Sequence, residues 1–277
     1  MTILVFTLIL LVGAYMAGFL GSLTGLGGGV IIIPLLTLVF HVDIRYAIGA
    51  ALLASIATSS GAASAYVKEG ITNIRLGMFL EIATTIGAVI GAFIAIYMPT
   101  NAIAVIFGVV LIFSAAMTVR KKHEAKLTKG SKLSEKLKLN STYPVNGEKV
   151  SYQLTSVAGG FSLMTLAGVL SGLLGIGSGS LKVLAMDSTM KIPFKVSTTT
   201  SNFMIGVTAA ASAVVYLQRG YMDPGIAFPV VLGVLAGALT GAKILPKINP
   251  KILRIIFAVA ITAVAIEMII NGINHKF

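Results

Sequence analysis

Ten apolar runs separated by short polar segments make up most of the sequence, and they constrain the fold more than any other feature. Eight of the runs have about 20 residues, the length of an α-helix that crosses the hydrocarbon core of a bilayer. Charged residues make up only 11% of the 277 residues, against about a quarter in soluble domains. The runs cover residues 2–22, 28–40, 46–67, 74–98, 101–119, 153–173, 180–190, 196–217, 225–245 and 250–271. We therefore expect an all-α, multi-pass membrane protein with about ten membrane segments.

Two of the runs, residues 28–40 and 180–190, are too short to cross a bilayer as a helix. Each follows a glycine-rich stretch, GLGGG at residues 25–29 and GIGSG at residues 175–179. Each glycine costs about 1 kcal/mol in a helix interior, so several together interrupt the helix. An interruption at membrane depth is tolerated only where protein or a water-filled cavity covers it. The pattern predicts two short, broken or re-entrant half-helices beside eight full-length helices.

The second half of the chain repeats the first half at an offset of 150 residues without gaps. Gly25, Gly27 and Gly29 align with Gly175, Gly177 and Gly179. Further matches pair Thr58 with Thr208, Tyr66 with Tyr216, and Gly70 with Gly220. Chance matches between glycine-rich membrane helices do not explain three glycines and a tyrosine at one shared offset. The chain is expected to consist of two five-segment transmembrane repeats, 1–119 and 153–277, joined by the linker 120–152.

The basic residues indicate how the two repeats are oriented in the membrane. If each short run turns back inside the membrane, each half crosses five times and the halves are inverted. Then 17 of the 20 assignable Lys and Arg residues lie on the cytoplasmic side, against 13 for eight crossings with parallel halves. The positive-inside rule favours the inverted arrangement. The linker 120–152, with nine of the 21 basic residues, is then cytoplasmic and both termini are extracytoplasmic. The net charge of +12 is read as this topology signal, and no nucleic-acid partner is expected.

Paired broken helices in inverted repeats are typical of secondary transporters, whose binding site lies near the midplane where the breaks meet. The GLGGG stretch followed by Pro34, the degenerate second copy and the length of the chain resemble the TauE/SafE sulfite exporter family, also called TSUP. The resemblance implies transport of sulfite, organosulfonates, thiosulfate or similar small sulfur-containing anions across the cell inner membrane. The second half has Ser178 in place of Gly28 and no proline matching Pro34, so the two breaks are not equivalent.

The residues expected to touch an anion lie around the two breaks. A short helix after glycines presents unpaired backbone N–H groups, which an anion can approach closely. Lys182, in the first turn of the second short run, is expected to be the counter-charge, because a charge at membrane depth is costly and usually functional. The alternative is that Lys182 lies at the cytoplasmic edge and only fixes topology. The expected substrate-binding residues are Gly27, Gly28, Gly29, Gly177, Ser178, Gly179, Ser180, Lys182, Thr198, Thr199, Ser201 and Asn202.

The polar run from Ser197 to Asn202 has two interpretations. Its hydroxyl groups and the Asn202 amide can donate hydrogen bonds to anion oxygens. They can equally cap the helix that begins there or pack helices closely together. The weaker equivalent in the first half, from Ser55 to Ser60, fits the packing interpretation.

Glu81 and Glu267 are the acidic residues well inside apolar runs. Glu81 is the candidate to take up a coupling proton, with sodium as the alternative coupling ion, whereas Glu267 is expected at the interface. The chain has no cysteine and only three widely spaced histidines, so no metal site, cofactor or enzyme activity is expected. An anion channel and a transporter of a different small anion remain alternatives. A monomer and a homodimer are both compatible with the sequence.

The predicted topology can be tested by labelling single cysteines, since the natural chain has none. In intact cells, an impermeant maleimide is expected to label Thr2→Cys and Phe277→Cys but not Gly130→Cys. Labelling of Gly130→Cys from outside, or of only one terminus, would contradict the inverted arrangement.

Overall fold

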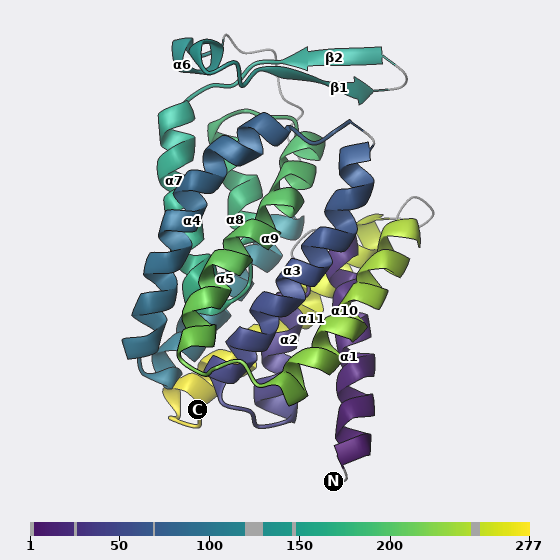
Figure 1. The fold of residues 1–277 in the computed structure, drawn as a ribbon, viewed down its shortest axis with the longest axis vertical. Helices are drawn as coiled ribbons and strands as arrows, with labels where there is room; N and C mark the ends of the chain where they lie inside the picture. Colours follow the sequence, from purple (N-terminus) through teal and green to yellow (C-terminus); the bar gives the residue numbers. More distant parts are fainter. Residues whose placement is uncertain (1–2, 25–26, 69, 120–129, 146–147, 245–249) are drawn as a thin grey trace.

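The structure is a bundle of helices with a small two-stranded hairpin across one end (Figure 1). The computed structural model describes residues 3–24, 27–68, 70–119, 130–145, 148–244 and 250–277. The first half contains α1 (Ile3–Thr24), α2 (Gly29–Pro34), the π-helix η1 (Leu35–Val39), α3 (Ile44–Lys68), α4 (Ile74–Tyr97) and α5 (Thr100–Val119). The linker contributes α6 (Lys132–Lys136), β1 (Ser141–Val145) and β2 (Glu148–Tyr152). The second half contains α7 (Val157–Leu174), α8 (Gly179–Leu184), η2 (Ala185–Thr189), α9 (Phe194–Gln218), α10 (Pro224–Ile244) and α11 (Pro250–Ile273).

Each of the two short apolar runs forms a six-residue α-helix that continues as a five-residue π-helix. In the first half, α2 ends at Pro34, which has no backbone N–H and so removes a bond from the i→i−4 ladder. The second half widens into η2 at the equivalent position without a proline. A wider turn at this position therefore forms in the second half without a proline.

The helices identify the chain as a multi-pass membrane protein. Among the described residues, six helices are long and apolar enough to cross a bilayer, namely α1, α4, α5, α7, α9 and α10. The apolar segments Gly29–Val39 and Ala258–Ile273 are shorter. The helices α3 and α11, with 25 and 24 residues, lie where the remaining two long runs are predicted. The mostly helical fold is as expected, while the number of crossings remains a prediction.

Helices from the two halves pack against each other at very short range. The pairs α1 with α10, α4 with α7, and α5 with α11 each combine one helix from each half. A Cβ atom on Gly18 would collide with the carbonyl of Val234, and one on Gly168 with the carbonyl of Thr84. The two contacts are related by the repeat offset of 150 residues, since Gly18 aligns with Gly168 and Thr84 aligns with Val234. Glycine at these positions lets the two helix backbones touch, as in small-xxx-small packing.

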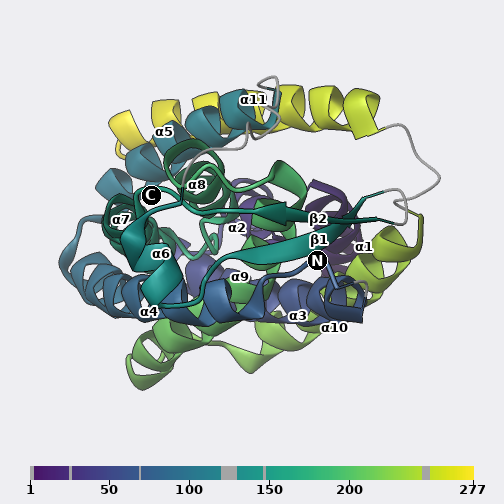
Figure 2. The same cartoon turned by 90° about the horizontal axis from the view of Figure 1, so that it is seen from above.

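The linker departs from the all-α expectation, because β1 and β2 pair as an antiparallel hairpin with Ser141 opposite Tyr152. The sequence Asn146–Gly147 between the strands is a strong hairpin signal, which the pattern of apolar runs does not contain. Seen from above, the hairpin lies across the end of the bundle (Figure 2). Both chain termini lie toward the opposite end (Figure 1).

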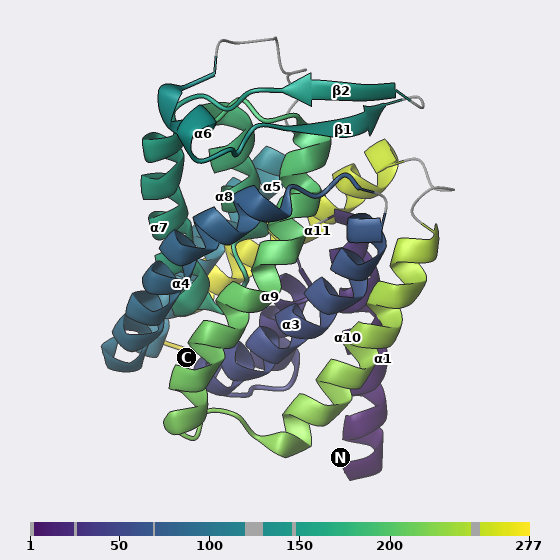
Figure 3. The same cartoon turned by 45° about the horizontal axis from the view of Figure 1, so that its top comes forward.

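Asn73, immediately before α4, joins the linker to the bundle. Its side-chain oxygen accepts a hydrogen bond from the Leu76 N–H (3.0 Å), which caps α4. Its amide donates to the Leu139 carbonyl (3.0 Å) and to the Tyr152 hydroxyl (2.8 Å). Burial raises the pKa of Tyr152 to about 12, so the hydroxyl stays neutral. Tyr152 belongs to a hydrophobic cluster that includes residues of α4, α7, η2 and α9. Figure 3 shows the hairpin across the end of the bundle that these helices form.

We expect Asn73→Ala to loosen the linker from the bundle. The substitution removes a helix cap and two buried hydrogen bonds, at a cost of about 2–4 kcal/mol. Tyr152→Phe removes one of these bonds and should cost about 1 kcal/mol. Limited proteolysis within residues 130–152 should be faster for Asn73→Ala than for Tyr152→Phe. Equal cleavage rates in both variants and the natural protein would show that this contact does not hold the linker.

Candidate functional site

The two glycine-rich breaks meet between α3 and α9. A Cβ atom on Gly29 would lie 2.9 Å from the Gly175 carbonyl oxygen, so backbone from the two halves is in contact there. Gly27 and Gly177 have positive φ angles of 83° and 67°, which side-chain-bearing residues rarely adopt. Cβ atoms on both of them would have the side chain of Ile205 as their nearest neighbour. The predicted meeting of the breaks is therefore present in the fold.

Several groups expected to be free for an anion already have partners inside the protein. The Gly28 N–H donates to the Thr58 hydroxyl (3.2 Å). The Ser178 hydroxyl donates to the Ala167 carbonyl in α7 (2.6 Å). The hydroxyls of Ser180 and Ser114 hydrogen-bond each other at 2.7 Å. The expectation of unpaired amides must be corrected at Gly28, because a helix break inside an apolar bundle is stabilised by neighbouring polar side chains.

The polar run of α9 fits the packing interpretation better than the anion-binding one, because most of its hydroxyl groups donate to carbonyls of the protein. Thr198 and Thr199 donate to carbonyls of their own helix, those of Phe194 (2.9 Å) and Lys195 (3.1 Å). Ser201 donates to the carbonyl of Gly179, the first residue of α8, at 3.1 Å. Ser201 thus joins α9 to α8, and all three hydroxyl groups already have acceptors within the protein.

Asn202 differs from its neighbours. Its backbone carbonyl accepts a hydrogen bond from the Ser59 hydroxyl, but its side-chain amide makes no hydrogen bond within the described part of the chain. The residue is only 5% exposed. The Ser55 hydroxyl, beside Gly29, is also buried and has no hydrogen-bond partner. The hydroxyl of Ser171, four residues before Gly175 in α7, is buried without a partner as well. Near the breaks, the described side chains with unused hydrogen-bonding capacity thus include Asn202, Ser55 and Ser171.

Lys182 is fully buried, with 0% exposure, so it is not a solvated residue at the membrane edge. Its ammonium group donates to the hydroxyl of Thr208 in α9 at 2.5 Å. The Thr208 hydroxyl donates in turn to Oε1 of Glu81 in α4 at 2.6 Å. Glu81 is 5% exposed, and its Oε2 is buried without a hydrogen-bond partner. The structure therefore brings together the two charged residues singled out in the sequence.

The role of Thr208 as the connecting residue was not anticipated. In the sequence, Thr208 stands out only as the repeat partner of Thr58. The sequence does contain a signal for Thr208. Ser201, Thr208 and Ser212 recur at helical spacing and so define one polar face of α9. That face points toward α4 and α8, since Ser212 also approaches the Ala88 carbonyl at 3.5 Å.

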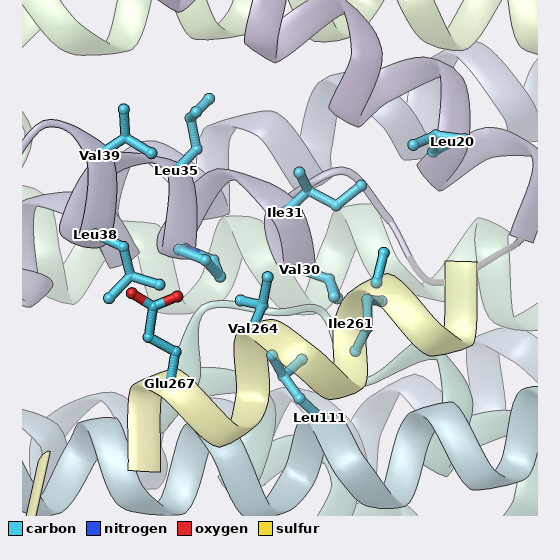
Figure 4. Close-up of a pocket in the computed structure, with 12 residues that line it drawn as sticks. Leu20, Val30, Ile31, Leu35, Leu38, Val39, Leu111, Ile261, Val264 and Glu267 are labelled. Carbon is cyan, nitrogen blue, oxygen red and sulfur yellow. The ribbon is translucent and has the colours of Figure 1, made fainter. Parts of the chain in front are cut away.

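Glu267 lies apart from this site, at one end of an apolar cavity of about 390 Å³ (Figure 4). The cavity is lined by apolar side chains of α1, α2, η1, α5 and α11, and Glu267 is its one charged lining residue. None of the side chains joined to Lys182 reaches it. Groups of three or more metal-ligating side chains are absent from the described residues.

Comparison with known proteins decides the family. The sequence model described as "Sulfite exporter TauE/SafE" matches residues 9–268. The chain belongs to the TauE/SafE family. The probable membrane transporter protein YunE of Bacillus subtilis is 31% identical over 232 residues, covering 81% of this chain and 83% of YunE. The probable membrane transporter protein YdhB of the same organism is 27% identical, covering 80% and 83%. No solved structure matches the chain with significance.

Family membership confirms the resemblance drawn from the GLGGG stretch and Pro34. It also agrees with the expectation of a membrane transporter. TauE/SafE membership does not by itself assign a role to any residue, so Lys182, Glu81 and Asn202 have to be argued from their surroundings.

Alanine at the two breaks is expected to abolish transport. In Gly29→Ala the new Cβ would lie 2.9 Å from the Gly175 carbonyl oxygen, and in Gly177→Ala it would strain a residue with positive φ. A left-handed conformation costs a side-chain-bearing residue about 1–2 kcal/mol. Gly61→Ala is the matched control, because its Cβ would have no neighbour closer than 3.6 Å. Anion uptake by proteoliposomes with matched protein content measures the effect. Equal loss in all three variants would mean that the glycines serve only general helix packing.

Proposed function

We propose that this protein is a secondary transporter of small sulfur-containing anions in the cell inner membrane, with the anion bound at Lys182 between the two broken helices. One observation carries the proposal: a lysine with 0% exposure lies in α8, three residues after the last glycine of the second break, in a TauE/SafE family member. A buried ammonium group is expensive to maintain and is retained in membrane proteins mainly for function. The family name supports the substrate class.

The donor groups around the junction suit a small oxyanion. An ammonium group has three N–H donors, and Lys182 uses one of them on Thr208. The Asn202 amide and the Ser55 hydroxyl add neutral donors with unused capacity. Sulfite and sulfonate groups present three oxygens that can accept from several donors at once. Gly27 and Gly177 carry no side chain, so the backbone of the two breaks can come close to other groups there.

Alternating access is supported by the relation between the halves. The close backbone contacts of α1 with α10 and of α4 with α7 recur at an offset of 150 residues. The described linker lies at the end of the bundle opposite the termini (Figure 1), which fits an odd number of crossings in each half and inverted repeats. In such transporters one repeat moves against the other around a fixed site. An anion channel would share the site but would not exchange anions in a saturable manner, so counterflow separates the two functions.

Lys182→Ala is expected to weaken anion binding by about 10- to 100-fold, because a charge-assisted hydrogen bond contributes about 1.5–3 kcal/mol. Lys182→Arg should retain part of the affinity, since the charge survives while the geometry changes. Asn202→Ala should cost less, because it removes a neutral donor.

Isothermal titration of the purified protein with sulfite, sulfate, thiosulfate, sulfoacetate and taurine measures these effects. Lys195→Ala is the matched control, because Lys195 is exposed at the start of α9. An unchanged dissociation constant in Lys182→Ala would remove Lys182 from the site. Failure of the natural protein to bind any of the five compounds would contradict the proposed substrate class.

A further inference from the structure

Lys182 and Glu81 are the two buried charged side chains among the described residues. They come from different halves of the chain, Lys182 from α8 and Glu81 from α4. They do not contact each other directly, because the Thr208 hydroxyl lies between them as acceptor from the ammonium group and donor to the carboxylate. Together the three groups carry no net charge when both residues are ionised.

The carboxylate of Glu81 is incompletely stabilised. Oε1 accepts from Thr208 at 2.6 Å and lies 3.4 Å from the Thr85 hydroxyl. Oε2 is buried and has no partner. A proton can bond to Oε2 without disturbing the bond between Thr208 and Oε1. The geometry therefore leaves one oxygen of this carboxyl group available for protonation.

The other elements packed against α4 offer Glu81 no alternative counter-charge. The sequence of α7 has no titratable side chain. In α9, Lys195 is exposed at the first turn and Tyr216 donates to the Gly172 carbonyl on α7. The linker contributes Tyr152, which bonds Asn73 at the start of α4. Lys182 in α8 is thus the cation on which the ionised form of Glu81 depends.

An anion that binds Lys182 changes this balance. With a monovalent anion present and Glu81 ionised, the buried site would carry one net negative charge, which is costly in an apolar interior. Taking one proton from the surrounding water onto Oε2 restores neutrality, because the ammonium group then balances the anion and the carboxyl group is uncharged. A divalent anion would leave a negative charge even after this protonation.

We propose that Glu81 takes up one proton each time a monovalent anion binds at Lys182, so that the anion and the proton cross the membrane together without net charge movement. This inference rests on the proposed function, since it assumes that the anion binds at Lys182. It adds a coupling ion and a charge preference, for monosulfonates or hydrogensulfite over sulfate.

The test uses methanesulfonate, which stays monovalent at the pH values used, and sulfate, which stays divalent. For the natural protein, the dissociation constant of methanesulfonate should fall about tenfold for each unit by which pH is lowered in the range where Glu81 is ionised. Titration in buffers of different ionisation enthalpy should detect about one proton taken up per anion. In Glu81→Gln the dissociation constant should not change with pH, and within that range the variant should bind more tightly than the natural protein.

Two further variants separate proton coupling from a structural role. Glu81→Asp keeps the carboxyl group and should keep the pH dependence, so it controls for damage to the fold. Glu267→Gln changes a carboxyl group at the apolar cavity and should bind as the natural protein does. Monodispersity and melting temperature identify any variant that fails to fold.

The outcomes distinguish the two proposals. Binding that depends on Lys182 but not on pH, or a Glu81→Gln variant with the natural pH dependence, would overturn proton coupling at Glu81 and leave the proposed function standing. Tighter binding of sulfate than of methanesulfonate would overturn the charge preference. If neither probe nor any compound of the anion panel binds the natural protein, the proposed function itself fails.

Discussion

The bundle is organised around the need to satisfy two interrupted helices inside an apolar interior. A break leaves backbone polar groups without helical partners, and each unsatisfied group is costly where water is excluded. The Thr58 hydroxyl accepts from the Gly28 N–H, and the Ser201 hydroxyl donates to the Gly179 carbonyl. Side chains of α3 and α9 thereby provide partners at the breaks. The stability of the breaks therefore accounts for these polar residues of α3 and α9 without reference to a substrate.

The helices surrounding the breaks are held by close backbone contact. Gly18 lies against Val234, and Gly168 against Thr84, so α1 packs on α10 and α4 on α7 with no side chain between them at these points. Apolar burial contributes little to helix association in lipid, and tight packing of small residues contributes more. Because each pair joins the two halves, the same contacts that stabilise the bundle also form the surface between the halves.

The charged pair lies across that surface. Glu81 belongs to the first half, and Lys182 and Thr208 belong to the second. A movement of one half against the other changes the separation between the ammonium group and the carboxylate. In the proposed mechanism, proton uptake at Glu81 and anion binding at Lys182 are linked at this place to the arrangement of the halves. This connection makes Thr208 as important to the site as the two charged residues that it joins.

The sequence by itself determined the membrane class, the two short helices and the family. The length of an apolar run determines whether it can cross a membrane as a helix, and clustered glycines interrupt a helix whatever surrounds them. It also singled out Lys182 and Glu81, because charge at membrane depth is costly wherever it occurs. Only the tertiary structure decided which polar groups are free. Ser178, Thr198, Ser201 and Asn202 are all short polar residues close to the second break. The hydroxyl groups of the first three donate hydrogen bonds to backbone carbonyls, whereas the Asn202 amide donates none. Hydrogen-bond partners come from helices distant in sequence, as with Thr208 and Glu81, 127 residues apart, and local pattern contains no information about such pairs.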